Sequence, residues 1–118
     1  MTPELLVRGL KARLVDSTVD EYREHLENNS PEHNTGVVSP RMFSYYQSLD
    51  SDQREIFFDV VRQIEIDTVA DFLAYLDGAY WFQEQTADMR LTTVENPEEP
   101  LNGSLADIFL NLVHDGNH

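Results

Sequence analysis

The longest helical period in this chain lies between residues 51 and 77, and it limits the folds open to the chain. Asp50 and Gln53 have the spacing of a capping box, in which two side chains bond each other's backbone N–H groups and begin a helix. Gly78 suits the left-handed position that follows a helix. Between these ends the apolar residues cover more than half of the helical wheel: Ile56, Phe57, Val60, Val61, Ile64, Val69, Phe72, Leu73 and Leu76. We therefore expect a central helix over about 51–77, with the other helices packed around it.

Caps and apolar spacing predict the remaining helices. Thr2 followed by Pro3 favours a helix over about 3–15, and Asp16 or Ser17 could cap a second, surface-lying helix. Ser39 before Pro40 predicts a short helix as far as Leu49. The capping-box spacing of Ser104 and Asp107 predicts a final helix that ends at Gly116. Asp67 and Thr68 could also cap a new helix, which leaves open a kink or break in the central helix near 66–68.

Two segments lack helical periodicity. Residues 28–40 are rich in Asn, Ser and Pro, which favours a loop. Residues 79–95 contain aromatic and β-branched runs that favour a hairpin or two extended runs. The predicted fold is an all-α bundle of four to six helices, with a small extended or hairpin insertion at about 79–95, in one domain spanning 1–118.

Charge restricts the partners of such a chain. It has 22 Asp and Glu against 8 Lys and Arg, a formal net charge of −14. Binding a polyphosphate requires cationic groups that release counterions, so direct nucleic-acid or anionic membrane binding is not expected. A basic protein partner is favoured instead. The excess is most one-sided in residues 79–118, where Arg90 is the only Lys or Arg. Solubility and adaptation to a salty cytoplasm are alternative causes of the acidity.

Several site types are not expected. The chain has no cysteine, so it can hold no disulfide and no cysteine-based metal site. It has no phosphate-binding glycine loop and no Gly-x-Ser-x-Gly elbow. His114 and His118 have the spacing of two helical metal ligands, but Gly116 interrupts the helix between them; His25 and His33 have no partner motif. We therefore predict no catalytic residue, metal site or cofactor. A protein that is not an enzyme is the simpler hypothesis, with the small enzyme below as the alternative.

Localisation and oligomeric state are less constrained. No stretch approaches the roughly 20 apolar residues of a membrane span. Since the N-terminus also lacks a cationic segment followed by an apolar run, a cytoplasmic location is expected. The oligomeric state stays open.

Paired acids offer a weaker site. Asp67 and Asp71 share one helical face, as do Glu55 and Asp59, and both pairs are expected to be solvated. Glu55 and Asp59 should form an ion-pair cluster with Arg62. In the alternative hypothesis of a small helical enzyme or ligand-binding domain, Asp67 or Asp71 would be buried beside a pocket between the central helix and the aromatic insertion.

Aromatic residues gather where the central helix ends. Exposed Tyr and Trp among carboxylates provide desolvated area, cation–π faces and ion pairs for a cationic partner. Core packing of Trp81 and Phe82 is the competing expectation. The predicted partner-binding residues are Asp71, Tyr75, Asp77, Tyr80, Trp81 and Glu84.

The chain resembles the small acidic immunity proteins of bacterial toxin systems, which occlude a cationic toxin such as a nuclease. The resemblance lies in general character, while residues 66–78 (IDTVADFLAYLDG) and 101–110 (LNGSLADIFL) look like segments of uncharacterised bacterial proteins. It implies a non-catalytic inhibitor that neutralises or escorts a basic protein. Mimicry of nucleic acid, with carboxylates in place of phosphates, is a variant of this hypothesis.

Overall fold

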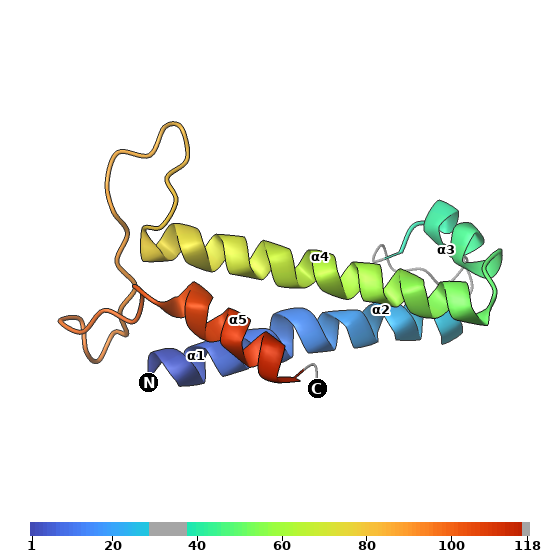
Figure 1. Cartoon of the computed structure of the whole chain (residues 1–118), viewed down its shortest axis with the longest axis horizontal. Coiled ribbons are helices and arrows are strands. Elements are labelled where there is room, and N and C mark those ends of the chain that lie inside the picture. The colour runs from blue at the N-terminus through green and yellow to red at the C-terminus, as the bar shows by residue number, and fades with distance from the viewer. Residues whose placement is uncertain (29–37, 117–118) are drawn as a thin grey trace. The chain divides into compact units, whose positions relative to one another are not determined.

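The structure is a computed structural model that describes residues 1–28 and 38–116. Within these residues every regular element is a helix and no strand occurs, so the all-α prediction is confirmed (Figure 1). The helices form two compact units. Unit 1 comprises residues 1–12 and 66–116, and unit 2 comprises residues 13–65. The predicted loop at 28–40 lies mostly outside the described residues.

The first helical run is longer than predicted. Helix α1 (Pro3–Leu10) begins as expected, because the Thr2 Oγ1 atom accepts a hydrogen bond from the Leu5 N–H. A π-helical segment, η1 (Lys11–Asp16), then leads directly into α2 (Ser17–Asn28). The expected cap at Asp16 or Ser17 is therefore wrong. The Asp16 carboxylate instead lies 2.9 Å from the Arg62 guanidinium, and a π turn widens a helix without ending it.

Helices α3 (Pro40–Gln47) and α4 (Ser51–Asp77) follow their predicted caps. The Ser39 hydroxyl accepts from the Met42 N–H. In the capping box, the Asp50 N–H donates to the Gln53 side chain and the Gln53 N–H to the Asp50 carboxylate, both at 2.9 Å. Helix α4 is continuous, so the alternative break near 66–68 is not observed.

Helix α4 ends in a Schellman motif at Gly78. Gly78 has φ +84°, its N–H donates to the Tyr75 carbonyl, and the Ala79 N–H donates to the Ala74 carbonyl. Only glycine adopts this backbone conformation at little cost. Residues 79–104 then run without strand or helix up to α5 (Leu105–Gly116). The hairpin alternative is therefore wrong, and the segment is irregular chain with turns at 83–84 and 97–98.

Each unit has an apolar core. In unit 1, helices α1 and α5 pack together, and the buried side chains are Val7, Ile66, Val69, Leu73, Ala74, Leu105, Phe109 and Val113. In unit 2, one buried cluster of Leu26, Val38, Tyr46 and Phe58 is flanked by Tyr22, Phe43 and Phe57. No described helix has both the length and the apolar character that crossing a bilayer requires.

The apolar arc of α4 is only partly covered. Phe58, Ile66, Val69 and Leu73 are buried, whereas Ile56, Val60, Ile64 and Phe72 are exposed. The expectation that this whole arc packs against other helices is therefore wrong. Ile56, Val60 and Ile64 lie four residues apart and form an apolar row open to solvent, while Phe72 is exposed on a different side of the helix.

Candidate functional site

Tyr75, near the end of α4, and the aromatic residues just after the helix gather at the surface of unit 1. The Tyr75 ring centroid lies 5.8 Å from that of Tyr80 and 6.2 Å from that of Phe82, both in tilted or edge-on geometries that aromatic pairs favour. The Trp81 indole N–H donates to the Asp88 carboxylate at 3.2 Å. We call Tyr75, Tyr80, Trp81 and Phe82 the aromatic face.

Most of the aromatic face is open to solvent. Tyr80 is 55% exposed, Trp81 49% and Phe82 53%, while Tyr75 is half-buried. The expectation that Trp81 and Phe82 pack in the core is therefore wrong. The physical reason is that the Schellman turn at Gly78 directs the chain off the end of α4 before these residues, so they contribute little to the core that Leu73 and Phe109 fill. Their exposure leaves apolar area available to a partner.

Three exposed acids accompany the aromatic face along the chain. Asp71 lies one helical turn before Tyr75 on α4, and Glu84 lies two residues after Phe82. Asp88 is also exposed and accepts the indole hydrogen bond. The guanidinium of Arg90, the one Lys or Arg of residues 79–118, donates to the Glu98 carbonyl at 2.8 Å.

Asp77, another predicted partner-binding residue, is held within the protein. One carboxylate oxygen accepts from the Gly103 N–H at 2.7 Å and the Leu105 N–H at 3.1 Å, and the other from the Ala106 N–H at 2.8 Å. These N–H groups are the unsatisfied donors at the start of α5. The end of α4 therefore caps α5, in place of the predicted box of Ser104 and Asp107.

Asn102, which sequence reasoning did not single out, fixes the return of the insertion. Its amide nitrogen donates to the Leu76 and Met89 carbonyls, and its amide oxygen accepts from the Leu91 N–H at 2.8 Å. The Leu101 N–H also donates to the Leu91 carbonyl at 2.7 Å. The Asn102 side chain thus satisfies backbone groups of Leu76, Met89 and Leu91 in a stretch that forms no strand. The only sequence signal was the turn-prone Asn102–Gly103 pair.

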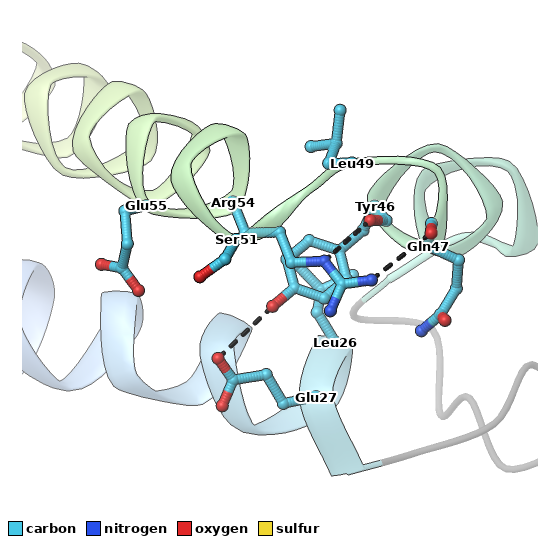
Figure 2. Close-up of a pocket in the computed structure, with 8 residues that line it drawn as sticks. All are labelled: Leu26, Glu27, Tyr46, Gln47, Leu49, Ser51, Arg54 and Glu55. Carbon is cyan, nitrogen blue, oxygen red and sulfur yellow. Dashed lines mark hydrogen bonds between the residues drawn. The ribbon is translucent and has the colours of Figure 1, made fainter.

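Unit 2 contains a polar pocket of about 460 Å³ (Figure 2). Its polar groups are bonded to one another: the Tyr46 hydroxyl donates to Glu27, and the Arg54 guanidinium donates to the Tyr46 and Gln47 carbonyls. The same guanidinium lies 4.5 Å from the centre of the Tyr46 ring. Leu26, Leu49, Ser51 and Glu55 complete the lining. Its charged groups are thus held in a network of hydrogen bonds within unit 2.

Electrostatics in unit 2 agree with that interpretation. Burial raises the pKa of the Tyr46 hydroxyl, and the adjacent Glu27 carboxylate raises it further. Arg23 bonds both oxygens of Glu55, at 2.9 and 3.2 Å, and this hydrogen bonding and charge lower the pKa of Glu55. Glu55 therefore pairs with Arg23, and the expected cluster of Glu55 with Arg62 is wrong because Arg62 bonds Asp16.

The alternative hypothesis of a small enzyme or ligand-binding domain required Asp67 or Asp71 to be buried beside a pocket, and neither is. Asp67 and Asp71 are both exposed, and no charged side chain in residues 1–28 and 38–116 is buried. A cavity of about 610 Å³ does lie by the insertion, but its acidic lining is Asp77 and Asp88. The expectation of a buried acid at Asp67 or Asp71 is therefore wrong.

Metal ligands do not gather in the described residues, where no three His, Asp or Glu side chains could hold one ion. His114 is exposed, and His33 and His118 lie outside the described residues.

Comparisons with protein-family models, curated proteins and solved structures find no match to this chain.

Proposed function

We propose that this chain is a non-catalytic acidic binding protein that neutralises or escorts a basic protein partner, in the manner of an immunity or inhibitor protein. The observation that carries the proposal is the half-exposed state of Tyr80, Trp81 and Phe82 in a segment whose acids outnumber its bases seven to one over residues 79–118. Exposed aromatic rings supply contact area, and surrounding carboxylates attract a cationic surface.

The chemistry of the partner follows from the charges. Residues 79–118 hold seven acids and one arginine, so the segment is strongly negative, and Glu84 and Asp88 are among its exposed acids. A partner for this surface presents Lys or Arg around an apolar patch that accepts Trp81. Charge sets the rate of encounter, and the buried rings set the lifetime of the complex.

The test begins with the partner and ends with kinetics. The tagged chain is used as bait in a lysate of the cells that produce it, and the captured protein is purified. We expect a protein of net positive charge. Its association with the wild type is followed at low and high salt through the fluorescence of Trp81, the single tryptophan of the chain.

A double variant then tests the charge of the surface. Asp71→Asn with Glu84→Gln should slow association about tenfold at low salt and flatten its salt dependence, with little change in dissociation. Asp77 is left intact because its carboxylate caps α5. The control is Asp20→Asn with Glu24→Gln, two exposed acids of α2, which removes the same charge elsewhere.

The aromatic contribution is measured separately. Tyr80→Ser should raise the dissociation rate about tenfold or more, since it removes ring area from the interface. The proposal fails if the captured protein is acidic, or if the surface variants bind with wild-type rates and salt dependence.

A further inference from the structure

A second surface, in unit 2, lies apart from the aromatic face in sequence and has its own apolar character. Helix α3, the turn after it and the first part of α4 enclose an open hollow of about 420 Å³, with a predominantly apolar lining. We call it the α3–α4 groove. Its lining residues are Tyr45, Leu49, Gln53, Ile56, Phe57 and Val60.

The floor of the groove is fixed by ring contacts. The Phe57 ring centroid lies 6.1 Å from that of Tyr46, 5.6 Å from that of Phe58 and 6.3 Å from that of Tyr45. Tyr46 and Phe58 belong to the buried cluster of unit 2. The groove is thus preformed on core residues, which lowers the cost of ordering it on binding.

An apolar ridge borders the groove along α4. Ile56 is 60% exposed, Val60 52% and Ile64 59%, and their spacing of four residues places them along one side of the helix. Rows of residues four apart are the ridges that pack into the grooves of a second helix. The ridge and the groove together therefore have the relief that an amphipathic helix fits.

Charge identifies the kind of helix. Asp52 and Asp59 are both exposed. By helical geometry Asp59 lies on the flank of the ridge away from Phe57, and Asp52, four residues before Ile56, continues the row at its N-terminal end. The two arginines of this part of α4 are directed elsewhere, Arg54 to the Tyr46 and Gln47 carbonyls and Arg62 to Asp16. The open surface is thus apolar with an acidic border.

We infer that the α3–α4 groove binds an amphipathic helix of a partner protein, whose apolar side covers Ile56 and Val60 and whose Lys or Arg residues face Asp52 and Asp59. A second copy of this chain is a poor occupant, because it would bring the same acidic borders together on two bodies of formal charge −14. The helix-in-groove mode accounts for the apolar ridge and the charge at once.

The test uses a short synthetic amphipathic helix of leucine and lysine, titrated into the full chain with backbone amide NMR. The shifts of Ile56, Val60 and Ile64 should change on binding. Two control peptides separate the contributions: a scrambled sequence of the same composition, which keeps the charge without the apolar stripe, and a version with glutamate in place of lysine. Both should bind about tenfold or more weakly.

Matched variants locate the site. Ile56→Ser with Val60→Ser should weaken binding of the leucine–lysine helix about tenfold or more, since exposed apolar area is lost. Phe72→Ser, also an exposed apolar residue of α4, should leave the affinity within about twofold. Asp52→Asn with Asp59→Asn should weaken binding while leaving the apolar ridge intact, and thermal melts confirm that each variant is folded.

Each contrary outcome overturns the inference. Equal binding of the scrambled peptide, or equal losses in the ridge variant and Phe72→Ser, would mean that charge alone holds the peptide. A wild-type dimer in sedimentation that Val60→Ser dissociates would make a second copy the occupant. The groove and the aromatic face are tested independently, because Tyr80→Ser should not alter peptide binding.

Discussion

At the residue scale, Tyr46 shows how one side chain links the core of unit 2 to its surface. Its ring is buried against Phe57 and Phe58, while its hydroxyl donates to the Glu27 carboxylate at 3.3 Å. The Arg54 guanidinium lies over the same ring, 4.5 Å from its centre. Burial and the adjacent carboxylate both oppose ionisation, so the pKa of Tyr46 lies above its ordinary value of 10.0.

This residue predicts a loss of stability at alkaline pH. A hydroxyl whose pKa is higher in the folded than in the unfolded chain stabilises the fold fully below the unfolded value of about 10, and that stabilisation is lost as the pH rises through the folded value. Urea unfolding of the wild type and of Tyr46→Phe at pH 8 and pH 11 measures this loss of stability. Tyr46→Phe should cost about 1 kcal/mol at pH 8 and show a smaller alkaline loss.

Tyr45→Phe is the matched control for Tyr46, since Tyr45 is its neighbour on α3 and is exposed. It should retain the wild-type alkaline loss. A Tyr46→Phe protein whose stability falls between pH 8 and pH 11 as steeply as the control would contradict the assignment.

At the element scale, the helix ends separate what the sequence predicts from what it cannot. The caps at Thr2, Ser39, Asp50 and Gly78 are correct, because their hydrogen bonds join residues within five positions of one another. Helix α5 begins at Leu105 and ends at Gly116 as predicted, but the predicted capping residues of α2 and α5 are wrong. Asp16 and the N–H groups at the start of α5 take partners far along the chain, Arg62 and Asp77. Local spacing contains no information about such pairs.

The cap of α5 gives a prediction at this scale. Asp77→Ala removes the acceptor of three backbone N–H groups and should lower the free energy of unfolding by about 1–2 kcal/mol, the usual cost of losing a cap. Asp107→Ala, which the sequence places in the cap, should cost less, about 0.3–1 kcal/mol from its position in the first turn. Urea denaturation decides between them, and a larger loss for Asp107→Ala would refute the long-range cap.

At the scale of the whole molecule, charge dominates. The eight Lys and Arg cannot pair one to one with the 22 acids, and some are already bonded to backbone carbonyls, as Arg54 and Arg90 are. The remaining carboxylates repel one another across a small body. The described ion pairs, such as Arg13 with Glu21, are largely at the surface, where each contributes about 0–1 kcal/mol.

We therefore expect the melting temperature to rise between about 10 mM and 500 mM KCl, because salt screens repulsion over a Debye length of roughly 30 Å at the low end and a few Å at the high end. A folded protein at the low end would count against adaptation to a salty cytoplasm as the cause of the acidity. Sucrose at matched osmolality is the control for effects other than screening. A melting temperature that falls with added salt would contradict the repulsion argument.

The part of the candidate site that the sequence cannot predict depends on the fold of the whole molecule. The sequence identifies the aromatic residues and the acids, since composition and order suffice for that. It does not show that Trp81 and Phe82 are exposed, nor that Asp77 is committed to α5, because both depend on where the chain leaves α4. The α3–α4 groove was missed for a related reason: periodicity marks every apolar residue of α4 as core and cannot show which face lacks a neighbour.

The way in which the insertion is anchored affects how its sequence can evolve. Gly78 and Asp77 fix its departure and Asn102 its return, so the residues between these points do not determine where the helices end. Closing a longer segment costs little, about 0.6 kcal/mol for each doubling of its length. Tyr80, Trp81 and Phe82 can thus be replaced, and the segment lengthened, while α4 and α5 keep their sequences. In a lineage under pressure to recognise new molecules, this stretch can diverge quickly on a conserved helical frame.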